Sequence, residues 1–202
     1  MSAAHRLHRS PLYQQHFATV IDEDLAAMRL ALELASLAAT WQEVPVGAVI
    51  IDAQQRVIGM GVNQTIYAHD PTQHAEIAAL RDACLYVGNY RLPGAQLFVS
   101  LEPCMMCMGA MLHARLQRVV YGAIDPKTGV CQSVLKQQHY AALNHQTQIL
   151  GGVLADESSQ LLKSFFRARR QNAKAAKDLK GAKGIKDTQD IQDTKGVLGD
   201  NV

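Results

Sequence analysis

The chain has 202 residues and a formal net charge of only +2, from 20 Lys and Arg against 18 Asp and Glu. The length suits one domain with a hydrophobic core, and the balanced charge excludes a basic field over the whole surface, so any contact with nucleic acid must be local. No apolar run approaches the length that crosses a bilayer, so we expect no membrane partner.

The start of the chain shows no clear amphipathic pattern. Residues 1–21 contain no acidic residue and include Arg6 and Arg9. This composition has a faint likeness to an organellar transit peptide. Because the pattern of such a peptide is missing, we expect residues 1–20 to form a loose N-terminal extension.

A helix and two strands come next. Residues 22–24 are acidic and cap a helix whose apolar positions recur at helical spacing and face the core. These positions are Leu25, Met28, Leu32 and Ala35. Residues 46–51 and 57–62 indicate two strands joined by a short polar turn at residues 52–55.

Helices and strands then alternate. The pattern predicts a helix opened by His74, a strand at 97–100, a helix from Cys104 to Arg115, strands at 119–122 and, more weakly, 148–150, and a helix at 156–170. Such alternation is typical of a layered α/β domain with parallel neighbouring strands. Because the helices of His74 and Cys104 both follow strands, we expect their starts to meet at the carboxyl ends of the strands, where open α/β sheets bind ligands.

The composition changes after residue 172. Residues 173–202 alternate Lys, Asp, Gln, Gly and Thr, with few apolar residues and no aromatic ones. Such a segment cannot bury enough surface to offset the entropy of ordering it. We therefore expect a disordered polar tail over residues 173–202, in preference to a partner-binding helix, and a folded domain over residues 21–172.

Two short motifs carry the chemistry, His74-Ala75-Glu76 and Pro103-Cys104-Met105-Met106-Cys107. The cysteine pair alone could bind zinc, serve in redox chemistry or pack in the core, although a thioredoxin-like pair would follow the first strand of a small domain and lack the upstream His-Glu motif. Together the motifs offer zinc one imidazole and two thiolates and leave a fourth position open, as in catalytic zinc sites. This spacing is typical of zinc-dependent nucleobase deaminases.

The positions of these residues suit that chemistry. Cys104 and Cys107 lie one turn apart on the same helical face, and Pro103 fits the start of the helix. Thiolates at a helix N-terminus are stabilised by unpaired N–H groups and by the helix dipole. We expect His74, Cys104 and Cys107 to bind a zinc ion that activates water, and Glu76 to carry the proton of that water to the substrate. The alternative for Glu76 is a solvated helix residue.

Two further cysteines are present. Cys131 as a fourth ligand would close the zinc site, so we expect it to be a small buried residue instead. Cys84 lies ten residues beyond His74, about 15 Å along the helix axis, and is too far away to join the site. With two of its four cysteines assigned to zinc, the chain suits a reducing compartment, and we expect a cytoplasmic protein.

Further segments are shared with a known family. They are EVPVGAV (43–49), HDPTQHAEI (69–77), NYRL (89–92), LEPC (101–104), GAIDPKTG (122–129) and FFRARR (165–170). With these segments the chain resembles the bacterial tRNA-specific adenosine deaminases over nearly all of residues 25–170. The resemblance implies a three-layer α/β/α sandwich with a central mixed, mostly parallel five-stranded sheet of the cytidine deaminase-like kind. It also implies that a homodimer with one zinc ion per subunit converts adenosine to inosine by hydrolysis, at the wobble position of a tRNA anticodon. An arginine tRNA is the expected substrate, and residues 21–172 form the zinc-dependent deaminase domain.

Residue by residue, the resemblance implies substrate contacts from Val46, Asn63, Ala75, Glu102, Asp125, Phe166 and Arg169. Asn63 would hydrogen-bond the flipped base, with a turn residue as the alternative. Asp125 would accept from a ribose 2′-OH, or else initiate the turn at Pro126. Phe166 would lie near the anticodon loop and Arg169 near phosphates, with a solvated basic helix end as the alternative.

Two other functions stay open. A free-base deaminase, such as a guanine deaminase, could share both motifs but would not need the basic helix end at 165–170. A non-catalytic RNA-binding subunit would lack the glutamate of the first motif, whereas Glu76 is present. Val62 and Gln64-Thr65, which flank Asn63, differ from the aromatic residue and the basic residue with proline that many members of the family carry there.

Overall fold

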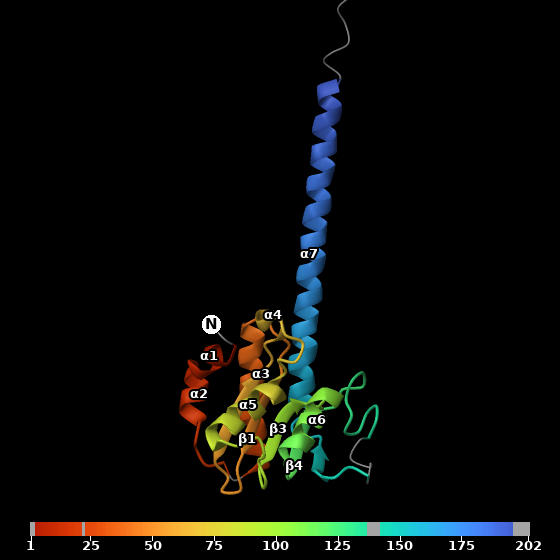
Figure 1. The fold of residues 1–202 in the computed structure, drawn as a ribbon. Helices are drawn as coiled ribbons and strands as arrows, with labels where there is room; N and C mark the ends of the chain where they lie inside the picture. Colours follow the sequence, from red (N-terminus) through yellow and green to blue (C-terminus); the bar gives the residue numbers. More distant parts are fainter. Residues whose placement is uncertain (1–2, 22, 137–141, 196–202) are drawn as a thin grey trace, which may run out of the picture. The chain divides into compact units, whose positions relative to one another are not determined.

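The computed structural model of the chain describes residues 3–21, 23–136 and 142–195. The chain divides into two compact units, Met1–Leu162 and Lys163–Val202. The first unit holds the sheet and the helices that cover it (Figure 1). No helix of the described residues is long and apolar enough to cross a membrane.

Five strands form one sheet in the order β2-β1-β3-β4-β5. Their bounds are Gly47–Ile51 for β1, Val57–Val62 for β2, Gln96–Leu101 for β3, Arg118–Ala123 for β4 and Gln148–Gly151 for β5. Strand β1 pairs antiparallel with both β2 and β3, while β3, β4 and β5 pair in parallel. Four strands therefore run in one direction and β1 runs in the other, which confirms the expected mixed, mostly parallel sheet.

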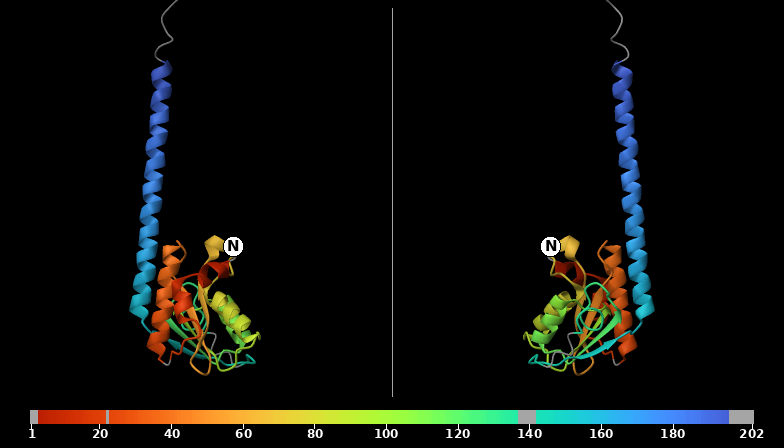
Figure 2. Two further views of the ribbon diagram at one scale, coloured as in Figure 1. Left: turned by 90° about the vertical axis from the view of Figure 1, so that its left-hand side faces the viewer. Right: turned by 90° about the vertical axis from the view of Figure 1, so that its right-hand side faces the viewer.

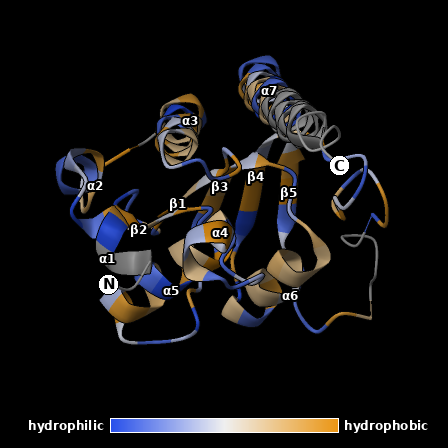
Figure 3. Cartoon of the chain, turned by 90° about the horizontal axis from the view of Figure 1, so that it is seen from above, coloured by the Kyte–Doolittle hydropathy of each residue, from blue (hydrophilic) through white to orange (hydrophobic). Residues whose placement is uncertain are grey.

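Helices cover both faces of the sheet. Helix α3 (Asp24–Thr40) lies on one face, and α5 (Ala75–Val87) and α6 (Met105–Ala114) lie on the other (Figures 2 and 3). The side chains of β1 alternate accordingly: Ala48 and Ile50 belong to the core beneath α5 and α6, whereas Val49 and Ile51 pack in the core beneath α3. The expected three-layer sandwich is confirmed.

Two glycines let α5 lie directly on β2. A Cβ on Gly61 would fall 2.0 Å from the carbonyl oxygen of Ala75, and a Cβ on Gly59 would fall 2.5 Å from that of Ala79. Any larger residue would push the helix away from the strand. The glycines therefore fix the height of the first turn of α5, which carries Glu76.

The N-terminal segment differs from the expected loose extension. It forms α1 (Ala3–His8) and α2 (Pro11–His16), and Leu7 is buried against the α3 core. Its end pairs with the sheet edge, where the N–H of Ala18 donates to the carbonyl of Val57 at 2.8 Å and the N–H of Val57 donates to that of Thr19 at 2.8 Å. Helices of six residues are too short to show a periodicity in the sequence. Tertiary contacts, and not helix propensity, stabilise such short helices.

One carboxylate of α5 ties this segment down. Asp82 accepts hydrogen bonds from the hydroxyl of Tyr13 at 2.9 Å and from the N–H of Met60 at 3.0 Å, and it lies 3.0 Å from Nε2 of His8. The guanidinium of Arg6 lies over the ring of Trp41, 4.0 Å from its centroid. The segment is thus anchored through polar and cation–π contacts as well as through the buried Leu7.

The C-terminal segment also differs from its prediction. Helix α7 spans Ala155–Lys195, so it continues well past residue 172 in place of the expected disordered tail. Residues 173–195 contain many Ala and Lys and no Pro, a composition that favours a helix whether or not it buries apolar surface. The prediction rested on the lack of a core and gave no weight to this propensity. The short helix α4 (Thr65–Ala68) is a further element that the sequence pattern did not indicate.

Candidate active site

Each of the two motifs places one side chain at a helix start. His74 is the N-cap of α5 and Cys104 is the N-cap of α6, both with extended backbone. Neither side chain hydrogen-bonds the first turn of its own helix. Strands β2 and β3 run in the same direction, so the two helices that follow them begin at the same edge of the sheet, as expected.

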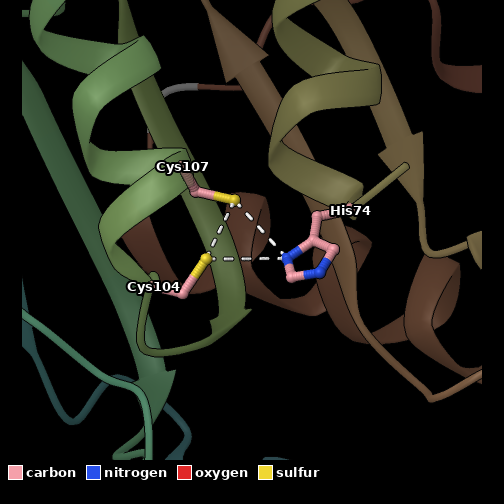
Figure 4. Close-up of side chains that lie close together, drawn as sticks. All are labelled: His74, Cys104 and Cys107. Carbon is pink, nitrogen blue, oxygen red and sulfur yellow. Dashed lines mark hydrogen bonds between the residues drawn. The ribbon is translucent and has the colours of Figure 1, made fainter. Parts of the chain in front are cut away.

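Three ligand atoms converge there (Figure 4). Sγ of Cys104 lies 3.6 Å from Sγ of Cys107 and 3.7 Å from Nδ1 of His74, and Sγ of Cys107 lies 3.6 Å from the same nitrogen. A tetrahedral zinc ion with ordinary Zn–S and Zn–N bonds separates two sulfur ligands by about 3.8 Å and a sulfur from a nitrogen by about 3.6 Å. The three side chains therefore already have the spacing of a zinc site with three protein ligands.

The thiols share their protons unequally. A hydrogen bond from Cys107, together with the nearby His74, lowers the pKa of Cys104 to about 4. The same contact with Cys104, followed by burial and the carboxylate of Glu76, raises the pKa of Cys107. One thiolate thus forms readily, and a divalent cation is what makes a second thiolate favourable beside it.

Glu76 lies in the first turn of α5, two residues after His74, and is only 4% exposed. Burial raises the pKa of its carboxyl, while a backbone N–H and His74 favour the ionised form. A carboxyl whose pKa is raised more readily keeps a proton that it has accepted and can donate it later in the reaction cycle. Glu76 is therefore a buried side chain of the site and not a solvated helix residue.

These groups line a cavity of about 240 Å³. Its lining consists of Val44, Val46, Asn63, Thr65, His74, Glu76, Leu101, Glu102, Cys104, Asp125 and Thr128. Four of the seven expected substrate residues are among them. Val46 belongs there because β1 runs opposite to the other strands, which places its start at the edge where β2 and β3 end.

Asn63 and Ala75 support each other. The side-chain oxygen of Asn63 accepts a hydrogen bond of 2.9 Å from the N–H of Ala75, and both residues are buried. This bond fixes the chain between His74 and Glu76. The amide group of Asn63 keeps its NH2 as a donor toward a substrate, while its oxygen is engaged by the N–H of Ala75.

Of the residues expected to contact RNA, Asp125 lies at the cavity, whereas Phe166 and Arg169 belong to the second unit. Asp125 lines the cavity, and its carboxylate also accepts from the N–H of Lys127 at 2.9 Å and from the hydroxyl of Thr128 at 2.6 Å, so it forms the turn as well. Phe166 and Arg169 lie on α7 in the second unit. Their contact with RNA stays a prediction.

Four residues of the cavity were not predicted from the sequence to line it: Val44, Thr65, Leu101 and Thr128. They come from the residues before β1, from α4, from β3 and from the loop after β4, and no local pattern distinguishes them from other apolar or hydroxyl residues. Cys131 is fully buried, and its N–H donates to Glu102. Its sulfur is not part of the ligand cluster of His74, Cys104 and Cys107.

Comparisons with known proteins agree with this site. Residues 21–123 match the family described as the cytidine and deoxycytidylate deaminase zinc-binding region. The tRNA-specific adenosine deaminase of Haemophilus influenzae is 47% identical over 156 residues, which are 77% of this chain and 90% of that protein. A solved structure from a study of A-to-I editing by tRNA:A34 deaminases at the wobble position has 42% identity and a TM-score of 0.65, over 68% of this chain and 99% of the other. A guanine deaminase from Nitrosomonas europaea has 23% identity and a TM-score of 0.67, over 77% and 92%, and shares the fold.

The chain is thus a zinc-dependent deaminase, a hydrolase that acts on carbon–nitrogen bonds. It belongs to the cytidine and deoxycytidylate deaminase family and, within it, to the family of the tRNA-specific adenosine deaminases. The residues that could hold a zinc ion are His74, Cys104 and Cys107, whose ligand atoms lie within 4.8 Å of one another.

Proposed function

We propose that this protein hydrolyses the 6-amino group of adenosine at the wobble position of a tRNA anticodon, giving inosine and ammonia. The main support is the buried carboxyl of Glu76, which lines one cavity together with His74 and Cys104 of the ligand cluster. The relatives are tRNA adenosine deaminases, which indicates the class of substrate. The side chains of the cavity provide the groups that this reaction needs.

Glu76 is the general acid and base of the proposed reaction. In the reaction, water adds to C6 of the purine, the C6–amine bond breaks and ammonia leaves. When bound, zinc supplies the Lewis acidity that makes water nucleophilic near neutral pH. Glu76 accepts a proton from this water, passes it to N1 of the ring and then assists protonation of the leaving amine. Its raised pKa suits both directions of transfer.

The remaining cavity residues position the base. The NH2 group of Asn63 faces an acceptor on the purine, because its oxygen is bound to Ala75. A base can enter such a cavity only outside a stack, and an anticodon loop presents unpaired bases at low unstacking cost. Asp125 then accepts from a ribose 2′-OH, and Phe166 and Arg169 contact the loop and its phosphates.

We further propose a homodimer in the cytoplasm, where tRNA substrates are available. The exposed apolar side chains Met105 and Met106 on α6 give a second copy an apolar surface beside the zinc ligands. Sedimentation analysis of the zinc-loaded protein tests this assembly. A monomer at micromolar concentration contradicts it.

A guanine deaminase is the second candidate, because that fold is shared. The two functions differ in the substrate that is turned over. We expect an arginine tRNA transcript with adenosine at the wobble position to gain inosine at that position alone, and free guanine to stay unchanged. Sequencing of the product and assay of released ammonia measure both, and ammonia from guanine contradicts the proposal.

A further inference from the structure

Glu102 is a buried carboxylate between the sheet and the zinc ligands. It follows β3 directly and precedes Cys104 by two residues, and it is 2% exposed. No Lys or Arg is paired with it among the ion pairs of the described residues. Hydrogen bonds stabilise its negative charge instead. The donors all lie in one segment, residues 125–133, which we call the 125–133 loop.

The carboxylate accepts five hydrogen bonds from this loop. Oε1 accepts the N–H groups of Cys131 at 3.0 Å, Gln132 at 2.6 Å and Ser133 at 2.9 Å. Oε2 accepts the N–H of Asp125 at 2.9 Å and the hydroxyl of Ser133. Both ends of the loop are thus bound to a single side chain.

The backbone is shaped around this carboxylate. A Cβ on Gly129 would lie 2.4 Å from Cδ of Glu102, so only glycine leaves room for the carboxylate to enter the loop. The N–H of Val130 donates to the carbonyl of Pro103 at 3.0 Å, and Gly129 pairs with Cys104 in an isolated β-bridge. The loop is therefore held against the start of α6, where Cys104 and Cys107 lie.

We propose that Glu102 is a positioning residue: it holds the 125–133 loop so that Asp125 and Thr128 line the cavity beside the zinc ligands. Asp125 points its own N–H at Glu102 and its carboxylate at Thr128. Glu102 is 2% exposed and its oxygens together accept five hydrogen bonds from the loop, whereas Asp125 is only half-buried, so Glu102 acts on the substrate through Asp125 and not by direct contact. The consequence for RNA rests on the function proposed above.

The chemistry of a carboxylate is required at this position. An ionised Glu accepts hydrogen bonds on both oxygens and donates none. In Glu102→Gln one oxygen is replaced by NH2, which faces a donor, either the N–H of Asp125 or the three N–H groups of residues 131–133. A buried donor left without an acceptor, next to a second donor, forces the loop to shift.

The first test needs no RNA. In zinc-loaded Glu102→Gln we expect amide hydrogen exchange at Asp125 and at residues 131–133 to rise by about tenfold or more, since bonds to a charged acceptor are lost. Zinc content should stay at that of the wild type. Ser133→Ala, which removes only the hydroxyl donor, should give a smaller rise. Unchanged exchange in Glu102→Gln overturns the proposal.

A matched control is Glu43→Gln. Glu43 is also a buried carboxylate, and it accepts the N–H groups of Ile66 at 3.2 Å and Tyr67 at 2.8 Å on α4. This variant should speed exchange on α4 and leave the 125–133 loop as in the wild type. A rise in the loop as well would show that any buried carboxylate has this effect, and it would overturn the specific role of Glu102.

The second test uses an anticodon stem-loop with a ribose or a deoxyribose at the nucleotide that Asp125 reads. In Glu102→Gln we expect KM to rise by about tenfold and the preference for ribose to fall, with a smaller change in kcat, because the reacting groups stay in place. Glu43→Gln should keep the ribose preference. A loss confined to kcat overturns positioning through Asp125. An inactive wild type contradicts the proposed function alone, and the exchange experiment still decides the role of Glu102.

Discussion

Glu76 and Cys131 are both buried near the zinc ligands, but their surroundings give them different roles. Glu76 lines the cavity, and burial raises the pKa of its carboxyl. The sulfur of Cys131 lies outside the ligand cluster, and its backbone N–H supports Glu102. We therefore expect Glu76 to transfer protons and Cys131 to pack in the core.

Glu76→Ala should keep one zinc ion per chain and lose activity by a factor of about 10² to 10⁴, because a general acid–base group is removed and no ligand is. Metal analysis and turnover of a stem-loop substrate measure the two effects separately. Loss of zinc together with Glu76 would show that this carboxylate is a ligand.

Cys131→Ser should leave the zinc content unchanged and lower stability by about 1 to 3 kcal/mol, because a hydroxyl is buried where a thiol was. Burial, then the charges of Glu102 and Glu76, raise the pKa of Cys131 to about 12. The folded protein should therefore resist alkylation at this cysteine at pH 8, where the thiolate is scarce. Depletion of zinc in the variant would mean a closed site with four protein ligands.

Among the helices and strands, local sequence patterns predicted the elements whose formation depends mainly on nearby residues. The five strands follow from short apolar runs, α3 follows from its apolar spacing, and the two motifs mark the starts of α5 and α6 and the three side chains of the ligand cluster. Arg115, expected as the last residue of its helix, is instead the C-cap of α6, in the left-handed region. A boundary of one residue depends on such capping geometry, which periodicity does not report.

The misses share a cause. Helices α1 and α2 depend on Asp82, more than sixty residues away in sequence, and the 125–133 loop depends on Glu102, which precedes it by 23 to 31 residues. Contacts at such separations leave no trace in a sequence window. The cavity residues Thr65 and Thr128 were missed for the same reason, because the fold and no local pattern brings them to the zinc ligands.

The N-terminal segment gives a prediction at this scale. Tyr13→Phe removes the hydroxyl that donates to Asp82, and it should lower the free energy of unfolding by about 1.5 to 3 kcal/mol, as expected for a bond to a charged group. Urea unfolding measures this loss. Tyr90→Phe, at an exposed tyrosine, is the control and should have little effect. No loss in Tyr13→Phe would restore the loose extension.

The same bond predicts a dependence on pH. Burial and then Asp82 raise the pKa of Tyr13 above its ordinary value of 10.0, so the folded protein favours the neutral phenol. The stability from this contact is complete below pH 10 and is lost as the pH rises through the pKa of the folded state. The difference in unfolding free energy between the wild type and Tyr13→Phe should shrink in that range. A constant difference would contradict the contact.

Unlike the N-terminal segment, the end of α7 is expected to contribute little to the stability of the body. Truncation after Asn172 should remove helical circular dichroism but leave the melting temperature of the body and the deamination rate nearly unchanged, because residues 173–195 are polar and belong to the second unit. A large fall in either quantity would show that this part of the helix packs on the body or binds RNA.

At the scale of the whole molecule, a net charge of +2 limits what electrostatics can do. Binding through many phosphate contacts would give a steep dependence on salt. This chain has to recognise its substrate mainly by the shape of the loop and by the cavity that receives one base. The central claim is therefore that the protein deaminates an adenosine in an RNA loop and not adenosine in general.

The most direct measurement compares kcat/KM of the zinc-loaded protein for an anticodon stem-loop with a wobble adenosine and for free adenosine. We expect ready inosine formation in the stem-loop and turnover lower by several orders of magnitude on the free nucleoside, because only the loop offers Asp125 the sugar-phosphate chain beside the target adenosine. Comparable values for the two substrates would contradict it and identify a nucleoside deaminase.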